Sequence, residues 1–405
     1  MRVLMLSWEY PPKIVGGIAR HVYDLSQALA ANGVEVDVVT CEHPDAPSDE
    51  KEGNLRVHRV PAEPGDDFVH WVHNLNVSIE KRVDELLAAE KLWAMDCNSI
   101  PGGQPMVLHA HDWLTEFCGK NIKHKYRIPL ISTIHATEHG RNHGIHTDLQ
   151  RYIHGVEWEL AFESWRVICC SEYMKNEINS TLEVPVDKLD VIPNGVDASK
   201  FQVEFDKAEF RSYFAKPNEK IIFFVGRMVH EKGVQVLIEA LPMILEAYND
   251  SKLVIVGGGN KDHLIQRVNE LGLNDRVLFT GYIDDDTLLK LYNVIDVAVY
   301  PSLYEPFGIV ALEAMAAKVP VVVTDVGGLR EVVDHGVGGL TAWSDNPESL
   351  AWAITQILKN PYSAKMMVEN AYRKVVEVFN WDLIAQQTAA VYERVWSEYE
   401  QSDWK

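Results

Sequence analysis

Two glutamates flank an apolar segment in the second half of the chain. Glu305 and Glu313 lie eight residues apart in the stretch YPSLYEPFGIVALEAM, residues 300–315. The residues before Glu305 are typical of a strand, and those after it indicate a helix that opens at Phe307 to Ile309. The first N–H groups of a helix lack partners inside it, and eight residues span little more than two turns. Both carboxylates are therefore expected near the helix start, where they could bind hydroxyl groups, although the spacing also fits a surface loop glutamate and a separate helix glutamate.

Two cations follow another expected strand. In FFVGRMVHEKGV, residues 223–234, Arg227 comes just after the strand and Lys232 five residues later, between Gly226 and Gly233. An arginine fork and a lysine point charge at the mouth of a sheet suit a diphosphate. Two solvated surface cations are the alternative, and the position at a strand end favours a ligand site.

Paired glycines supply a third candidate anion site. PPKIVGGIARHV, residues 11–22, runs through Gly16 and Gly17 into an expected helix. Glycines allow the backbone to approach a ligand, and a helix start favours an anion. VGGLREVV, residues 326–333, repeats this arrangement, although a pair of glycines alone is a weak indication.

Composition narrows the class of protein. The chain has 405 residues, of which 47% are hydrophobic and 24% charged, as in a globular protein of two or three domains. A formal net charge of −21 disfavours nucleic acid and anionic membranes as partners. No apolar run approaches the ~18 residues of a membrane span, and five cysteines without a CxxC motif favour a reduced, cytoplasmic location.

Strand-like and helical patterns alternate along most of the chain. Continuous apolar strands separated by helices indicate parallel sheets that are covered on both faces. The pattern restarts after the Pro-Asn-Gly turn of IPNGVD, residues 192–197, which predicts a second α/β domain. Two such domains can place the carboxyl ends of their strands across a cleft, where open α/β sheets bind ligands.

Eight segments, in this order along nearly the whole chain, resemble the retaining nucleotide-sugar glycosyltransferases of family 4. They are GGIARHV, HAHDW, TIHATEHGR, IPNGVD, VGRMVHEKG, FTGYIDDDTL, PSLYEPFGIVALEAMA and TDVGGLREVV. HAHDW and TIHATEHGR are most similar to glycogen and starch synthase-like members, followed closely by sucrose-phosphate synthase and trehalose synthase-like members.

The resemblance implies an α/β protein of the GT-B fold, in which two Rossmann-like β/α/β domains face each other across a cleft. Residues 1–200 would form the acceptor domain and 201–380 the nucleotide-sugar donor domain. The C-terminal helix, 381–405, would cross back to the N-terminal domain.

The resemblance also implies roles on the donor side. Arg227 and Lys232 would neutralise the donor diphosphate and the charge that builds on the leaving group. Glu305 would contact the donor sugar, and Glu313 would hold the ribose hydroxyls. The other implied donor-binding residues are Gly17, near the phosphates, Gly226, Tyr282, beside the base, and Phe307, Gly308 and Ile309, whose N–H groups would bind sugar hydroxyls.

On the acceptor side, the resemblance places His135 near the donor sugar as a fourth catalytic residue and Asp112 along the acceptor. His139 and Arg141 belong to TEHGRNHGIH, residues 137–146, a polar segment suited to a sugar or a phosphate. Glycogen and starch synthases carry a lysine two residues before their paired glycines, whereas Lys13 lies three residues before Gly16.

We therefore predict a retaining transferase that moves a glucosyl or other hexosyl unit from ADP- or UDP-glucose to a glucan or small sugar. Front-face attack and double displacement both give retention and stay open. Other acceptors, including a lipid headgroup or a sugar phosphate, a nucleotide-sugar epimerase and a non-catalytic nucleotide-sugar sensor, are the alternatives. Homo-oligomer formation is also left open.

Neither a metal nor a cofactor is predicted. The DDD triplet at 284–286 is better explained as helix capping than as a metal-binding DxD motif. The histidines of HAHD and those at 135, 139, 143 and 146 have spacings that fit a metal, but a polar acceptor loop is favoured. VGGGNKDH, residues 256–263, has Asp262 where a dinucleotide fingerprint needs glycine or alanine.

Overall fold

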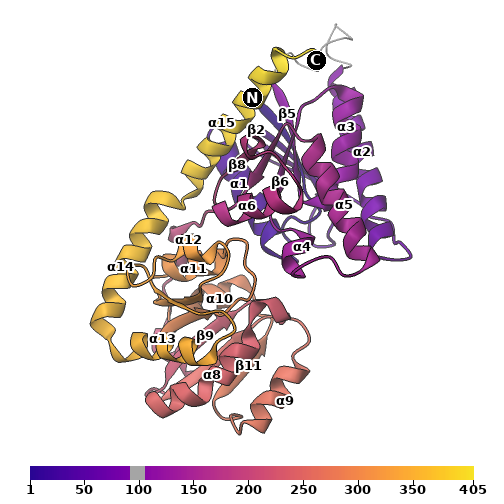
Figure 1. Cartoon of the computed structure of the whole chain (residues 1–405). Coiled ribbons are helices and arrows are strands. Elements are labelled where there is room, and N and C mark those ends of the chain that lie inside the picture. Colours follow the sequence, from indigo (N-terminus) through magenta and orange to yellow (C-terminus); the bar gives the residue numbers. More distant parts are fainter. Residues whose placement is uncertain (92–104) are drawn as a thin grey trace. The chain divides into compact units, whose positions relative to one another are not determined.

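The computed structural model describes residues 1–91 and 105–405 (Figure 1). The described chain forms two compact units, one made of Met1–Asn194 with Trp381–Lys405 and the other of Gly195–Asn380. Within the described residues, no helix has the length and apolar character needed to cross a membrane. Four free cysteines are buried, and Cys97 lies outside the described residues.

The first unit is built on an eight-stranded sheet of order β3-β4-β2-β1-β5-β6-β7-β8. Its strands are β1 (Arg2–Leu6), β2 (Glu35–Cys41), β3 (Asp49–Glu52), β4 (Leu55–Val60), β5 (Met106–His111), β6 (Leu130–Ile134), β7 (Arg166–Cys169) and β8 (Leu189–Val191). All pairs are parallel except β3 with β4. The sequence pattern missed β3 because its four residues, DEKE, are all charged and exposed, a composition that protects a sheet edge from further pairing.

Helices cover both faces of this sheet. They are α1 (Gly17–Ala31), α2 (Phe68–Lys91), α3 (Glu116–Tyr126), α4 (Glu138–Arg141), α5 (Asp148–Glu163), α6 (Glu172–Thr181) and α15 (Trp381–Glu400). Val3 and Met5 of β1 pack in one core with α1 and α15, whereas Leu4 and Leu6 pack in another with α2, α3 and α5. Successive strand residues point to opposite faces, so a strand buried on both sides must be apolar throughout.

The C-terminal helix α15 is part of the first core. Ile384, Tyr392 and Val395 are fully buried, and the Tyr392 hydroxyl lies 2.7 Å from His109 Nδ1 on β5. The last helix of the chain therefore packs on the sheet that contains the first strand, as Figure 1 shows.

The second unit contains a six-stranded parallel sheet of order β11-β10-β9-β12-β13-β14. Its strands are β9 (Lys220–Val225), β10 (Ser251–Val256), β11 (Val277–Gly281), β12 (Val297–Tyr300), β13 (Val321–Thr324) and β14 (Leu340–Ala342). Its helices are α7 (Lys207–Ser212), α8 (Val234–Ala247), α9 (Asp262–Glu270), α10 (Asp285–Tyr292), α11 (Ile309–Ala316), α12 (Leu329–Val332), α13 (Pro347–Lys359) and α14 (Pro361–Val378). The predicted α/β class with parallel sheets is confirmed.

Loops at the carboxyl ends of these strands pack backbone against backbone. Gly233, with φ +68°, would place a Cβ atom 1.8 Å from the carbonyl oxygen of Pro301, and Gly327, with φ +51°, would place one 2.0 Å from the carbonyl oxygen of Glu305. No larger residue fits either crossing without displacing the backbone. The glycines therefore bring the loop that follows β12 into contact with the loops that follow β9 and β13.

We expect Gly233→Ala to destabilise the second unit more than Gly272→Ala. Gly272 has the same φ of +68°, but a Cβ atom added to it would have nothing within 4 Å. The Gly272→Ala variant therefore isolates the cost of the backbone conformation. That cost is about 1 kcal/mol, and the clash at Gly233 should add roughly 2 kcal/mol or more. Urea unfolding of both variants measures the difference, and equal losses would contradict the proposed crossing.

Candidate active site

In the second unit, Lys232 and Glu305 form an ion pair between two of these loops. Lys232 ends a 3-10 helix (His230–Lys232, η4) after β9, and Glu305 lies in the loop after β12. Lys232 Nζ is 2.7 Å from Glu305 Oε2, and Glu305 is only 8% exposed. The N–H of Leu303 donates to the carbonyl of Glu231, which joins the two loops beside the pair. The structure thus brings together two residues that lie far apart in the sequence.

Arg227 lies on the same loop as Lys232 but keeps an accessible side chain. Its guanidinium side chain is 57% exposed, and its ionic partner is Glu231, at 3.8 Å. The backbone around it is fixed, because the N–H of Gly226 donates to Val256 O and the N–H of Met228 donates to Gly258 O. A rigid loop with an accessible guanidinium can receive an anionic ligand.

Helix α11 begins beside Glu305. Gly308 is its N-cap residue, with φ +105°, and the N–H groups of Phe307, Gly308 and Ile309 donate to none of the described residues. The Phe307 ring is buried against Phe379, with ring centroids 5.9 Å apart, which holds this turn in place. These N–H groups remain available as donors, as a helix start predicts.

The two glutamates of the opening motif have different partners. Glu313 is 7% exposed and accepts a hydrogen bond of 3.0 Å from the hydroxyl of buried Tyr292, which lies 3.2 Å from the Tyr300 hydroxyl. Glu305 instead contacts an ammonium group. Glu305 is therefore not the exposed loop residue of the alternative interpretation.

Tyr282 and the second glycine pair have contrasting environments. Tyr282 follows β11 and is 78% exposed, so its ring is free to pack against a ligand. Gly328, in contrast, donates its N–H to Glu305 O at 3.0 Å, and a Cβ on it would lie 2.4 Å from Pro306 O. The glycines at 327 and 328 thus serve loop packing, a role that the anion-site interpretation of this pair missed.

The DDD triplet caps a helix, as predicted. Asp284 is the N-cap residue of α10 and accepts the N–H of Thr287 at 2.9 Å. Asp286 pairs with Lys290 one turn later on the same helix. Both contacts are local helix interactions.

In the first unit, the N-terminus of α1 is held by Glu9, which the sequence analysis did not identify as a site residue. Its Oε2 accepts the N–H groups of Val15 at 2.5 Å and Gly16 at 3.0 Å. Glu9 is 1% exposed, and burial raises the pKa of its carboxyl group despite these donors. Gly17 is exposed at the helix start. The available sequence signal for Glu9 was the position of an acidic residue just after the first strand.

The Lys13 side chain packs against two residues of the first unit. Its Nζ lies 2.8 Å from Cys41 Sγ and 4.7 Å from the centroid of the Trp71 ring. This packing fits the shifted spacing of Lys13 relative to the paired glycines.

Asp112 and His135 meet at the carboxyl ends of β5 and β6. Asp112 Oδ1 accepts the backbone N–H of His135 at 2.7 Å, while Asp112 Oδ2 is buried and lies 3.9 Å from Arg141. Asp112 has φ +59°, a strained conformation for a non-glycine residue. Burial raises the pKa of Asp112 to about 6, although Arg141 opposes the rise. His139, on the same helix as Arg141, faces His154, with ring centroids 6.5 Å apart.

Half-buried His135 belongs to a cluster of neutral imidazoles with buried His21 and His111. Its Nε2 lies 3.1 Å from His111 Nδ1, and its ring centroid is 4.6 Å from that of His21. Burial, with Arg141 nearby, lowers the pKa of His135 to about 3, and burial also lowers the pKa values of His21 and His111. His135 can therefore donate or accept a hydrogen bond at neutral pH but carries no charge.

These three histidines are the only group in the described part of the chain whose ligand atoms approach closely enough for a metal, all within 4.8 Å. The histidine set at 135, 139, 143 and 146 does not assemble, because His146 Nε2 bonds to Asn142 O and His139 faces His154. The i, i+4 spacing was therefore misleading as a metal signal.

Glu157 on α5 is a second site residue that the sequence analysis missed. One carboxylate oxygen accepts the N–H of Glu138 at 2.8 Å and so anchors helix α4, which carries His139 and Arg141. The other oxygen is buried without a hydrogen bond from the described residues. Burial raises the pKa of Glu157 to about 8. A glutamate on the same helix face as the buried Ile153 and Leu160 was the available signal.

Models of two known families match most of the chain. The model of glycosyltransferase family 4 matches residues 15–200, and that of the glycosyl transferases group 1 matches residues 205–374. The chain belongs to glycosyltransferase family 4. The family 4 resemblance is thereby confirmed, and the protein is a glycosyltransferase.

Individual relatives span this family 4 glycosyltransferase almost end to end. An uncharacterized glycosyltransferase of Methanocaldococcus jannaschii is 41% identical over 397 residues, which are 97% of this chain and 98% of that protein. A glycogen synthase of Mycobacterium tuberculosis is 35% identical over 409 residues, covering 97% and 94%. The solved sucrose-phosphate synthase of Thermosynechococcus elongatus superposes with a TM-score of 0.82 at 26% identity, covering 98% and 99%, which confirms the GT-B fold.

We expect the free energy of unfolding of Glu157→Gln, relative to that of wild type, to increase as pH rises. Between the ordinary pKa of about 4.5 and the folded value of about 8, the unfolded carboxyl ionises while the folded one keeps its proton. The contribution of Glu157 to wild-type stability thus decreases as pH rises and becomes constant above about pH 8. From pH 6 to 9, the variant should gain roughly 2–3 kcal/mol relative to wild type.

Denaturant unfolding at several pH values measures this change. Glu393→Gln, at an exposed position on α15, is the control and should show no such trend. A difference between Glu157→Gln and wild type that stays constant from pH 6 to 9 would contradict the assigned burial.

Proposed function

We propose that this glycosyltransferase moves a glucosyl or other hexosyl unit from ADP- or UDP-glucose to a glucan or small sugar, with retention at the anomeric carbon. The observation that carries the proposal is the contact between Lys232 and Glu305, beside exposed Arg227 and the unused N–H groups at the start of α11. One loop cluster thereby offers cations for a diphosphate and hydrogen-bonding groups for a sugar. The similarity to a glycogen synthase supports the glucan acceptor.

The two cations would act on the leaving group. When the bond from sugar C1 to the diphosphate oxygen breaks, negative charge builds on that oxygen. Arg227 and Lys232 would stabilise this charge in the transition state, a contribution that preorganised groups make without reorganisation. Because Lys232 already contacts Glu305, bringing a sugar hydroxyl to Glu305 also brings the phosphate side of the donor to the ammonium.

Other second-unit residues would orient the donor. The N–H groups of Phe307, Gly308 and Ile309 would donate to sugar hydroxyls, Glu313 would accept from the ribose, and the Tyr282 ring would pack against the base. Gly226 supports the loop of Arg227 through its hydrogen bond to Val256 O. From the first unit, Gly17 would approach the phosphates.

On the acceptor side, the reacting hydroxyl would lose its proton as its oxygen bonds to C1. In front-face attack, the leaving phosphate oxygen takes that proton, and the acceptor enters on the side that the diphosphate leaves. Double displacement would instead need a carboxylate nucleophile, and none is assigned. Asp112, His139 and Arg141 would bind the acceptor, and neutral His135 would hydrogen-bond near the donor sugar.

One observation favours a second candidate acceptor, a sugar phosphate. The Arg141 side chain is 36% exposed and lies near buried Asp112, so it could pair with a phosphate group. The similarity to a sucrose-phosphate synthase agrees with that alternative. A screen of donors against acceptors that detects released nucleoside diphosphate distinguishes the candidates, and no release with any pair would favour a nucleotide-sugar sensor.

We expect Arg227→Ala and Lys232→Ala each to lower turnover by roughly two orders of magnitude or more, because each removes a charge that stabilises the transition state. Lys290→Ala, on the exposed face of α10, removes a cation of the same unit and should retain activity. Steady-state release of nucleoside diphosphate measures the effect. Near-normal turnover in both variants, with circular dichroism unchanged, would refute the assigned roles.

We expect activity to survive removal of divalent metals. Arg227 and Lys232 supply the positive charge that a metal ion provides in metal-dependent sugar transfer. Turnover should be the same after dialysis against EDTA and after addition of Mg²⁺ or Mn²⁺. Loss with EDTA and recovery with metal would overturn this part of the proposal and direct attention to the cluster of His21, His111 and His135.

A further inference from the structure

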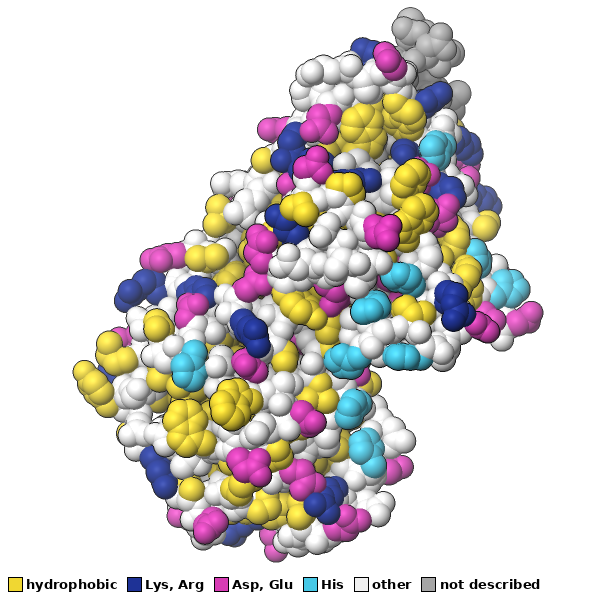
Figure 2. Space-filling model, in the orientation of Figure 1, with side chains coloured by type: hydrophobic (Ala, Val, Ile, Leu, Met, Phe, Trp, Pro, Cys, Tyr) yellow, Lys and Arg dark blue, Asp and Glu magenta, His cyan; other side chains and the backbone are white. Residues whose placement is uncertain are grey.

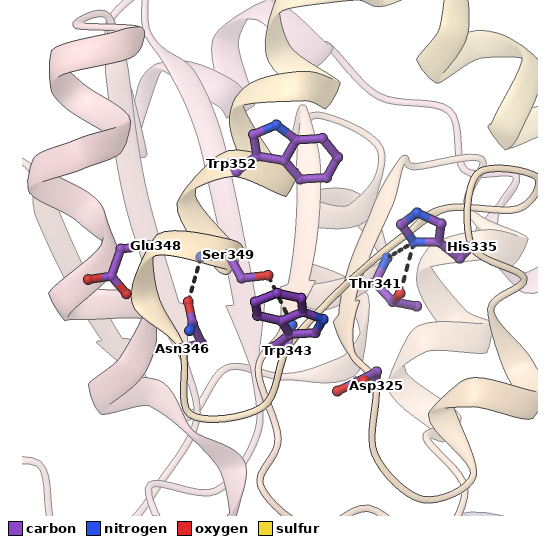
Figure 3. A pocket seen from close by; sticks show the side chains of 8 residues that line it. All are labelled: Asp325, His335, Thr341, Trp343, Asn346, Glu348, Ser349 and Trp352. Carbon is purple, nitrogen blue, oxygen red and sulfur yellow. Dashed lines mark hydrogen bonds between the residues drawn. The ribbon is translucent and has the colours of Figure 1, made fainter.

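A pocket of about 720 Å³ opens beside the edge strand β14 in the second unit (Figure 3). Its volume lies within the ~300–1,000 Å³ of small-molecule sites. Figure 2 shows large hydrophobic side chains at the surface over α13, the helix that forms one wall of this pocket. None of its lining residues belongs to the candidate transfer site described above.

Two exposed tryptophans dominate the pocket. Trp343 follows β14 and is 69% exposed, and Trp352 lies on α13 and is 53% exposed. An indole leaves a large apolar face in water, and exposed aromatic surface of this kind commonly marks a binding site. Figure 3 shows both rings projecting around the same opening.

The segment that carries these rings is held by hydrogen bonds. The N–H of Trp343 donates to Ser349 Oγ at 3.0 Å, and the N–H of Ser349 donates to Asn346 Oδ1 at 2.7 Å. Asn346 caps α13, and Pro347 occupies its first turn. Because the loop is fixed before any ligand arrives, binding needs little ordering of the chain.

Hydrogen-bonding groups surround the rings. The N–H of Thr341 donates to His335 Nδ1 at 3.0 Å, so in the neutral ring the proton lies on Nε2, which projects away from Thr341 as a free donor. The Glu348 carboxylate has no hydrogen bond or ion pair with any described residue, whereas the Asp325 carboxylate accepts the N–H of Ser344 at 3.3 Å and pairs with Arg330 at 3.3 Å. Both acceptors and a donor are therefore present.

We propose that this pocket binds a neutral α-glucan chain and so tethers the polymer away from the site of transfer. The pocket is lined by Asp325 and Glu348 but by no lysine or arginine, and nearby Arg330 is already paired with Asp325, which disfavours an anionic ligand. A glucosyl ring has apolar C–H faces that stack on indole and a rim of hydroxyls that donate to carboxylates and accept from His335. The choice of glucan rests on the proposed function, whereas the pocket chemistry stands without it.

Two tryptophans with two carboxylates could also attract a quaternary ammonium ligand through cation–π contacts. The free Nε2–H donor of His335 favours a hydroxyl-rich chain, because a quaternary ammonium group cannot accept a hydrogen bond. Choline is therefore the competing ligand in the test.

The test measures binding of maltoheptaose to the full chain by isothermal titration calorimetry, without a nucleotide sugar. Trp343→Ala and Trp352→Ala are compared with wild type and with Trp158→Ala, which removes a 45% exposed tryptophan of the first unit. Loss of a stacked ring should weaken binding about tenfold or more at the pocket, and Trp158→Ala should leave it unchanged. Thermal unfolding verifies that each variant is folded.

A second measurement separates this pocket from the transfer site. The two pocket variants should keep wild-type turnover on a short acceptor such as maltose but lose efficiency on glycogen. Unchanged maltoheptaose binding in both variants, absence of binding in wild type, preferential binding of choline, or an equal loss of turnover on maltose would each overturn the proposal. Failure of transfer with every donor would refute the proposed function but leave the binding result interpretable.

Discussion

The ion pair between Lys232 and Glu305 depends on close contact between loops that the chain forms far apart. Its carboxylate is largely buried, and withdrawing charges from water costs free energy that a single pair regains only with good geometry. Backbone crossings at Gly233 and Gly327 provide that geometry, because neither position tolerates a side chain. The rest of the candidate donor site, including the start of α11, is built around this fixed contact.

Buried carboxylates organise the first unit in a comparable way. Glu9 accepts the N–H groups of residues 15 and 16, Asp112 accepts that of His135, and Glu157 accepts that of Glu138. Burial raises the pKa of each of these three acids, so each resists ionisation in the folded protein. They fix loops that follow strands, which is where open α/β sheets gather their ligand-binding residues.

The charge distribution is compatible with the two proposed ligands, an anionic donor and a neutral polymer. With a formal net charge of −21, the whole molecule repels anions, so the proposed donor would need local cations such as Arg227 and Lys232. A glucan carries no charge and is unaffected by that field. The tryptophan pocket, with carboxylates and no lysine or arginine, suits such a ligand.

The sequence by itself determined the α/β class and the family and supplied the motifs of the candidate donor site, because apolar periodicity and short motifs are local properties of the chain. It missed β3, whose charged residues lack strand periodicity, and it missed Glu9 and Glu157, because acidic side chains are rarely buried and their positions after a strand and on an apolar helix face gave only a weak signal. It also missed the packing role of the glycines at 327 and 328, because only the folded chain shows the backbone they pack against. Tertiary structure alone decided which histidines meet and that Trp343 and Trp352 share one pocket, since such contacts join residues whose separation in sequence carries no distance information.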